Sequence, residues 1–321
     1  MGNFTVVVCG SPDYAKNLGK RSTASDMTFF DIKSGDATVT FVEPTKYPER
    51  LSTLFHAASM ADAALVVVDE IGPVLGETIV MLHCVGVRKG WLLLRNYITL
   101  DQLAPFLKGT ALEGYEPVQD DHAALRELML GEAAKAGSDE PEGDSCGSVP
   151  IDHHFDVKGV GTVILGRVAD GHIRKHDAIR VLPGGKDAEI RSIQKHDDDY
   201  DWAVKGDRVG LALKGVGAEE LDRGMVLTTD PALIERSTLT CVVEVVKYWT
   251  TPITEGMVLH VGHWMQFVPA KVEEVSEGAD KRRPRVTMQF QKPLAFKPGS
   301  KAALAYLEGG KLRVVGTVAL E

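Results

Sequence analysis

The sequence lacks the features that mark membrane or secreted proteins. No apolar run approaches the roughly 20 residues that a bilayer-spanning helix needs. The first residues enter an apolar segment without a preceding basic stretch, so we expect no signal peptide. The four cysteines are far apart and form no C-x-x-C pair, which favours reduced, buried thiols over a disulfide framework or a metal site. We therefore expect a cytoplasmic protein without a membrane partner.

An excess of positive charge is lacking as well. Lys and Arg number 36 against 45 Asp and Glu, giving a net charge of −9. This balance argues against unspecific binding of nucleic acid over the whole surface, and we expect no DNA partner. Residues 237–321 differ, because they carry 11 Lys or Arg against 8 Asp or Glu. A local phosphate-binding face towards the C-terminus therefore remains compatible with the composition.

The length of 321 residues predicts two or three domains, and residues 1–136 have an α/β pattern. Strands are expected at Phe4–Cys9, Met27–Ile32, Ala37–Val42, Ala64–Val68, Gly90–Arg95 and Thr110–Glu113. Helices are expected at Tyr47–Met60, Thr78–Val85, Asp101–Leu107 and Asp121–Lys135. Apolar strands interleaved with helices predict a mostly parallel sheet, with ligands at the C-terminal ends of its strands.

Residues 137–147, GSDEPEGDSCG, are acidic and rich in Gly, and we interpret them as a linker. Beyond them, short runs rich in Val, Ile, Thr and Gly alternate with turn signals about every 8–12 residues, a pattern typical of antiparallel barrels. A break near residues 230–236 divides this half. We therefore predict one barrel at residues 148–232 and a second at residues 237–321.

Two segments of the first barrel stand out. Ile151–Gly171 reads IDHHFDVKGVGTVILGRVADG, and Arg191–Val216 reads RSIQKHDDDYDWAVKGDRVGLALKGV. The turn Gly159-Val160-Gly161 would let backbone approach a ligand closely. Such a turn alone is weak evidence, because a tight barrel turn that binds nothing has the same sequence pattern.

Taken together, these segments resemble the second domain of translational GTPases, most closely of SelB-type and archaeal elongation factors. The resemblance implies an α/β P-loop-GTPase-like domain at residues 1–136, followed by two antiparallel β-barrels like domains II and III of EF-Tu. In that family the first barrel holds the aminoacyl end and terminal adenosine of tRNA. By position, the pocket would be formed by Asp152, His153, Phe155, Val160, Gly161, Thr162 and Gln194.

The resemblance continues more loosely into the last barrel, which in the family grips the acceptor and T stems of tRNA. The residues that would contact RNA phosphates are Lys281, Arg282, Arg283 and Arg285. A solvated basic loop is the alternative interpretation. His153, His154 and His196 have no ligand spacing or carboxylate partner that would indicate a metal or catalytic site, so we predict neither.

The nucleotide motifs of the family are degenerate here. Its phosphate loop has the form GHVDHGKT, whereas this chain has GSPDYAKN at residues 10–17. The remnant of a GTP or GDP site would be Gly10, Asp13, Lys16 and Asn17. Asn17 replaces the hydroxyl residue that holds magnesium, and Ala15 adds a Cβ where backbone must approach phosphate.

The other motifs depart in the same way. The segment that would hold the first switch is about half the usual length. Val42 to Lys46 replace the second-switch motif D-x-P-G-H, and Ile98 replaces the Asp that reads guanine. Thr110-Ala111-Leu112 resembles the motif that closes the base pocket. We expect no hydrolysis by the usual mechanism and predict no catalytic residue.

These observations leave three functional hypotheses. The first is an elongation-factor-like protein that binds aminoacyl-tRNA and the ribosome. The SelB-like character of RSIQKH would suit a non-standard amino acid such as pyrrolysine, although no residue indicates that amino acid. The second is an unorthodox GTPase that binds GTP or GDP with magnesium through Lys16. The third is a pseudo-GTPase regulatory or interaction module of the translation machinery.

Overall fold

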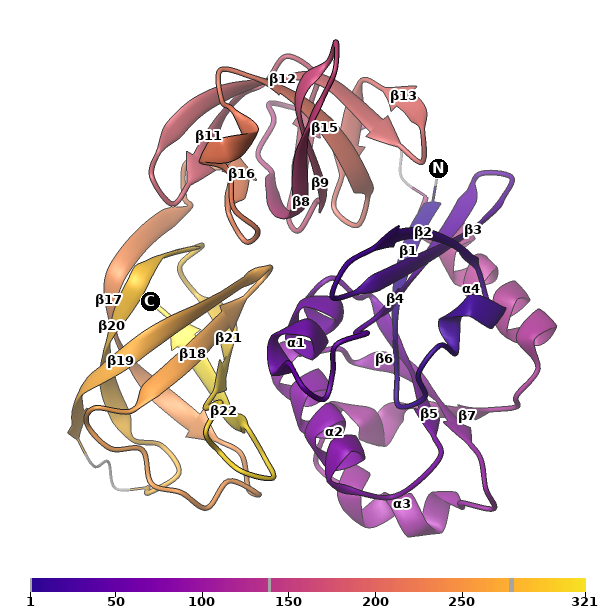
Figure 1. Cartoon of the computed structure of the whole chain (residues 1–321), viewed down its shortest axis with the longest axis vertical. Coiled ribbons are helices and arrows are strands. Elements are labelled where there is room, and N and C mark those ends of the chain that lie inside the picture. The colour runs from indigo at the N-terminus through magenta and orange to yellow at the C-terminus, as the bar shows by residue number, and fades with distance from the viewer. Residues whose placement is uncertain (1, 138–139, 277–279) are drawn as a thin grey trace.

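The computed structural model describes residues 2–137, 140–276 and 280–321. Residues 138 and 139 of the predicted linker lie outside this range. The chain forms an α/β domain and two β-barrels, arranged so that each contacts the other two (Figure 1). None of the helices in the described ranges combines the length and apolar content that a membrane span requires.

The α/β domain contains a seven-stranded sheet in the order β2-β3-β4-β1-β5-β6-β7. Its strands are β1 (Gly2–Cys9), β2 (Lys20–Ala24), β3 (Thr28–Ser34), β4 (Ala37–Glu43), β5 (Ala63–Val68), β6 (Lys89–Leu94) and β7 (Glu116–Val118). Strands β4, β1, β5, β6 and β7 run parallel, whereas β3 pairs antiparallel with β4 and β2 pairs antiparallel with β3. Every residue of β1, β4 and β5 is buried, which explains their continuous apolar runs.

Helices cover both faces of this sheet. They are α1 (Leu51–Ser59), α2 (Pro73–Val85), α3 (Leu100–Leu107) and α4 (His122–Lys135). The first three share one apolar core, and α4 packs on the opposite face. The helix predicted from Thr78 begins at Pro73 instead, because proline is favoured in a first helical turn.

Two parts of this domain differ from the prediction. The strand predicted at Thr110–Glu113 is wrong: a 3-10 turn, η2 (Ala111–Gly114), stands there, and the strand is β7. The Thr110 hydroxyl accepts a hydrogen bond from the Leu112 N–H, which caps a helical turn. After β1 a single 3-10 turn, η1 (Ala15–Asn17), leads into a β2–β3 hairpin, and the sequence did not predict β2.

The predicted antiparallel barrels are confirmed. The middle barrel closes in the order β11-β16-β8-β9-β15-β12, since β11 also pairs with β12. Its strands are β8 (Ser148–Val157), β9 (Gly161–Arg167), β11 (Ala178–Leu182), β12 (Lys186–Lys195), β15 (Arg208–Lys214) and β16 (Val226–Thr228). Shorter elements are β10 (His172–Arg174), β13 (Asp198–Tyr200), β14 (Trp202–Val204) and η3 (Ala218–Glu220).

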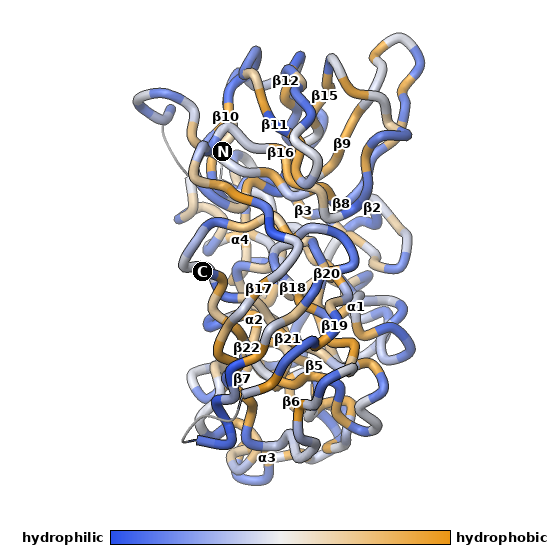
Figure 2. Tube along the Cα trace, turned by 90° about the vertical axis from the view of Figure 1, so that its left-hand side faces the viewer, coloured by the Kyte–Doolittle hydropathy of each residue, from blue (hydrophilic) through white to orange (hydrophobic). Residues whose placement is uncertain are grey.

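The last barrel closes in the order β17-β20-β19-β18-β21-β22. Its strands are β17 (Ile234–Val245), β18 (Val258–His263), β19 (Gln266–Ser276), β20 (Arg285–Phe296), β21 (Ser300–Ala305) and β22 (Val314–Leu320). Strand β17 begins within the segment predicted as the break. Figure 2 shows apolar and hydrophilic residues alternating along many barrel strands, as expected when one side faces a core.

Candidate functional site

The loop after β1 corresponds to the predicted phosphate loop. Gly10 has φ of 99°, and a Cβ at this position would lie 2.0 Å from the Val67 carbonyl oxygen. Glycine is therefore required by the neighbouring strand. Lys16 and Asn17 are exposed, and the Lys16 ammonium lies 4.0 Å from the Asp13 carboxylate. The four predicted residues thus share one loop, with the basic side chain in solvent.

A carboxylate of the protein itself occupies the inside of this loop. Glu43, the last residue of β4, is buried and accepts hydrogen bonds from the N–H groups of Asp13 and Ala15, the latter at 3.3 Å. Backbone N–H groups of this kind are what an anion binds in a phosphate loop. Burial raises the pKa of Glu43, and the two backbone hydrogen bonds oppose that rise. Two loop donors are thus already satisfied within the chain.

Polar side chains also fill the neighbouring strand ends, where a base would be read. The Tyr14 hydroxyl donates to Asp120 at 2.6 Å, and the Arg95 guanidinium lies 5.1 Å from the Tyr14 ring. Arg95 forms ion pairs with Asp120 at 2.7 Å and with Asp69 at 3.5 Å. Burial raises the pKa of Tyr14 above its usual range. These residues form an internal network at the ligand edge of the sheet.

The motif assigned from sequence to the base pocket lies elsewhere. Residues 110–112 precede β7, whereas the ligand edge of a parallel sheet is where its strands end. The Ala111 N–H donates to His83 at the end of α2, and Leu112 is buried in the core beneath that helix. The interpretation of Thr110-Ala111-Leu112 as a base-closing motif is therefore wrong. The segment after β7, which contains Asp120, stands at that edge.

Three of the predicted pocket residues lie on the outer face of the middle barrel. They are His153, Phe155 and Gln194. The pairing of β8, β9, β15 and β12 places His153 and Gln194 in one row across the barrel, with Leu165 and Gly210 between them, and Phe155 lies two positions along β8 on the same face. Gln194 is exposed and donates to Asp199 at 3.0 Å. The alternation of a barrel strand therefore directs these side chains away from the barrel core.

Two exposed apolar side chains lie at the end of this face, Phe155 in β8 and Val160 in the β8–β9 turn. Phe155 is 41% exposed and Val160 is 39% exposed. Gly161 has φ of 97°, and a Cβ there would meet no atom within 4 Å. Thr162 differs, because it is buried and its hydroxyl donates to the Val216 carbonyl at 2.9 Å. It supports the turn from inside.

Asp152 and His153 connect the barrel to the α/β domain. Asp152 is buried, forms an ion pair with Arg208, and lies 2.6 Å from the His153 Nδ1. Burial alone would raise the pKa of Asp152, but Arg208 and His153 outweigh burial and hold it at about 2. The His153 Nε2 lies 3.2 Å from the Ser25 hydroxyl, and Arg208 lies 4.3 Å from the Phe29 ring. Asp152 and His153 therefore both belong to the interface between the middle barrel and the α/β domain.

The predicted phosphate contacts cluster on the segment that enters β20. Lys281, Arg282, Arg283 and Arg285 are all exposed. The Arg283 guanidinium lies 3.8 Å from the Glu244 carboxylate, whereas the side chains of the other three form no ion pair in the described part of the chain. Lys281 and Arg282 also line a hollow of about 350 Å³ beside Trp249. The arrangement leaves positive charge available to an anionic partner.

The histidines do not form a metal centre in the part of the chain that the structure describes, where no group of three potential ligands occurs. The His196 Nε2 lies 3.1 Å from the Asn3 side-chain oxygen, at the interface with the α/β domain.

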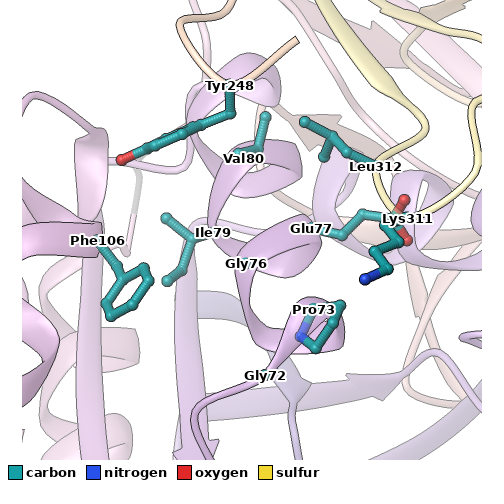
Figure 3. Close-up of a pocket in the computed structure, with 10 residues that line it drawn as sticks. All are labelled: Gly72, Pro73, Gly76, Glu77, Ile79, Val80, Phe106, Tyr248, Lys311 and Leu312. Atoms are coloured by element: carbon teal, nitrogen blue, oxygen red, sulfur yellow. The ribbon is translucent and has the colours of Figure 1, made fainter. Parts of the chain in front are cut away.

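A separate hollow of about 320 Å³ lies between α2, α3 and the last barrel (Figure 3). It is lined by Gly72, Pro73, Gly76, Glu77, Ile79, Val80, Phe106, Tyr248, Lys311 and Leu312. No residue of the predicted sites is among them.

Sequence reasoning missed Glu43, Arg208, Arg223 and Asp26. Glu43 carried a usable signal, since it ends an apolar strand at the edge where ligands bind. The other three act through pairings between distant segments, which a single sequence does not reveal.

Comparison with known proteins agrees with this architecture. Residues 161–228 match the family model for elongation factor Tu domain 2. An uncharacterised protein of Methanocaldococcus jannaschii is 37% identical over 98% of this chain and 99% of its own length. The selenocysteine-specific elongation factor of the same organism is 28% identical over 87% of this chain. The chain belongs to the SelB/EF-Tu-like elongation factor family.

Solved structures show the same fold. SelB from Methanococcus maripaludis in complex with the GTP analogue GppNHp has a TM-score of 0.79 at 21% identity, covering the whole of this chain and 79% of that one. This SelB/EF-Tu-like chain spans 64% of the length of the M. jannaschii selenocysteine-specific factor. It spans 52% of elongation factor 1-alpha from Methanosarcina acetivorans, with which it is 25% identical. None of these relatives connects the chain to pyrrolysine.

Proposed function

We propose that this chain binds an aminoacyl-tRNA through the outer face of its middle barrel and does so without a nucleotide cycle, as a cytoplasmic partner of the ribosome. The observation that carries the proposal is the pair of exposed apolar side chains Phe155 and Val160 beside the open backbone at Gly161. Aromatic side chains of this kind stack on unpaired bases, and a bare glycine lets a nucleotide approach the backbone.

The last barrel supports a second contact with RNA. Lys281, Arg282 and Arg285 are exposed cations whose side chains form no ion pair among the described residues. Phosphate contacts position an RNA without reading its sequence, so this loop would hold a helical stem while the barrel face holds the charged end. The net charge of −9 over the whole chain would confine RNA to these surfaces.

Nucleotide hydrolysis forms no part of the proposal. Glu43 takes up two loop donors, and Lys16 points into solvent. The domain then acts as a scaffold that presents the middle barrel.

Hydrolysis of the aminoacyl ester tests the proposal. A bound carrier shields the ester, so charged tRNA should lose its amino acid more slowly when the protein is present. Phe155→Ala should raise the protein concentration required for this protection about tenfold, since stacking on one base contributes ~1–3 kcal/mol. The matched control is Val258→Ala, which truncates an apolar side chain that is 46% exposed on β18.

Two results decide between this function and the alternative. If the parent protein does not slow ester hydrolysis for any charged tRNA of a native pool, the proposal is wrong. Sedimentation with ribosomes in the absence of any tRNA protection would instead support an interaction module. Recovery of bound RNA from native extract, with identification of the attached amino acid, then names the ligand.

A further inference from the structure

The Glu43 carboxylate accepts hydrogen bonds from the loop after β1, where the family binds a nucleotide phosphate. We propose that Glu43 is a built-in substitute for a nucleotide phosphate. It holds residues 10–16 closed and, through the segment that follows β4, keeps the β2–β3 hairpin fixed against the middle barrel. This inference concerns the arrangement of the domains and does not depend on RNA binding.

The first step is the contact with the loop itself. Both oxygens of Glu43 are used, one by the Asp13 N–H and the other by the Ala15 N–H. The side chain is 7% exposed and comes from the strand next to β1, so the backbone delivers it to the loop. An anion that is part of the chain is present at an effective concentration that a free ligand rarely reaches. The loop is therefore occupied whenever the domain is folded.

The second step leads from Glu43 to the hairpin. The Thr45 hydroxyl lies 2.7 Å from the Thr28 hydroxyl at the start of β3. The Lys46 N–H donates to the Asp26 carbonyl at 3.1 Å. Two bonds thus tie the segment after β4 to the end of the hairpin.

The third step joins the hairpin to the middle barrel. The Arg223 guanidinium donates to both carboxylate oxygens of Asp26, at 2.9 and 2.8 Å. Its Nε donates to the Asp152 carbonyl at 3.0 Å, and Ser25 contacts His153. The Asp26 and Arg223 side chains are 19% and 27% exposed, so solvent screens this pair less than a surface pair.

These contacts form a continuous series from the loop to the barrel, and all of them come from the chain itself. In switchable GTPases the terminal phosphate and its magnesium order the switch segments, which collapse when that phosphate is lost. A covalently attached carboxylate cannot leave. The domain arrangement should therefore be the same with and without nucleotide.

Limited trypsin digestion measures this coupling, because β2 contains Lys20 and Arg21 and is cut only when the hairpin opens. Glu43→Gln removes the charge and places an amide opposite the loop donors. We expect it to raise the rate of cleavage at Lys20 and Arg21 by about tenfold. Glu49→Gln, an exposed glutamate just beyond the same strand, should leave the rate unchanged. Millimolar GTP with magnesium should not alter the parent rate.

A double-mutant cycle tests whether the two ends act together. Asp26→Asn should also accelerate cleavage, and adding it to Glu43→Gln should give less than the product of the two effects. Asp36→Asn, at the exposed turn before β4, is the control. Equal cleavage rates in Glu43→Gln and Glu49→Gln would overturn the proposal.

A second measurement uses only the parent protein, so it does not rely on a variant that folds. Small-angle X-ray scattering should give the same radius of gyration with and without GTP and magnesium. A change in that radius on adding nucleotide would show that the arrangement depends on a free ligand, and the proposal would fail.

Discussion

Arg313, in the segment before β22, forms a two-pronged ion pair with Glu77 of α2. Its Nε donates to one carboxylate oxygen at 3.1 Å and its Nη2 to the other at 2.5 Å. The Glu77 side chain is 4% exposed, and the Arg313 N–H also donates to it at 2.8 Å. The last barrel thus supplies a charged partner for a buried carboxylate in the α/β domain.

Arg313→Ala should destabilise the protein, because it leaves the charge of Glu77 buried without its guanidinium partner. Removing one partner of a buried ion pair costs about 3 kcal/mol or more. Urea unfolding measures the loss. Lys311→Ala changes a neighbouring exposed side chain that forms no ion pair with any described residue, and it should alter the free energy of unfolding by less than about 0.5 kcal/mol. Equal effects of the two substitutions would contradict the role given to the pair.

Gly262→Ala should loosen the contact between α1 and the last barrel. A Cβ at this position would lie 2.5 Å from the Phe55 ring, which is 1% exposed and packs on Phe267 at 5.2 Å. Overpacking of this kind costs about 1–3 kcal/mol. Thermal unfolding should show a lower midpoint.

Gly76→Ala should instead stabilise the protein. A Cβ at Gly76 would meet no atom within 4 Å, and the residue lies inside α2 beside the open hollow of Figure 3. Alanine has the higher helix propensity by about 1 kcal/mol, so this variant should unfold at a higher temperature. A destabilised Gly76→Ala variant would show that the hollow is closed in solution.

Acid should weaken the interface between α1 and the last barrel. Burial lowers the pKa of His56 and of His263 from 6.5 to about 4, and burial also lowers the pKa of His260. Arg223 lowers the pKa of His56 further, whereas Asp26 opposes it. As the pH falls, the histidines of the unfolded chain are protonated before those of the folded chain. The stability that the neutral histidines contribute is therefore fully present above pH 6.5 and is lost as the pH drops towards 4.

Urea unfolding at about pH 7.5 and about pH 5 measures this loss, which should reach about 2 kcal/mol for each of the two most buried histidines. His56→Leu should reduce the pH dependence, since it removes one titrating ring whose Nδ1 has no hydrogen-bond partner among the described residues. An unchanged slope in that variant would assign the acid effect to other groups.

Nucleotide binding should be weak at most. We expect a fluorescent GDP analogue with magnesium to show no saturation at micromolar concentration, because Glu43 takes two of the loop donors. Binding that is tight in the parent protein and lost in Lys16→Ala would instead revive the hypothesis of an unorthodox GTPase. Lys158→Ala, on the exposed β8–β9 turn far along the chain, is the charge-matched control.

The sequence by itself determined the order of the domains and the position of most strands and helices. Continuous apolar runs such as Val6–Cys9 specify buried parallel strands, and the string around Gly161 specifies the middle barrel, because these signals are local. It also predicts that the nucleotide motifs are degenerate, a prediction that needs only the identity of residues at fixed positions.

Only the tertiary structure decided which side chains contact the loop after β1 and which join the domains. Glu43 and Asp13 are 30 residues apart, and Asp26 and Arg223 are 197 apart, so no local pattern pairs them. The same holds for Asp152, which sequence placed in a pocket and the fold places at a domain interface. Burial and charge pairing arise from how distant segments pack, and that packing assigned these side chains their partners.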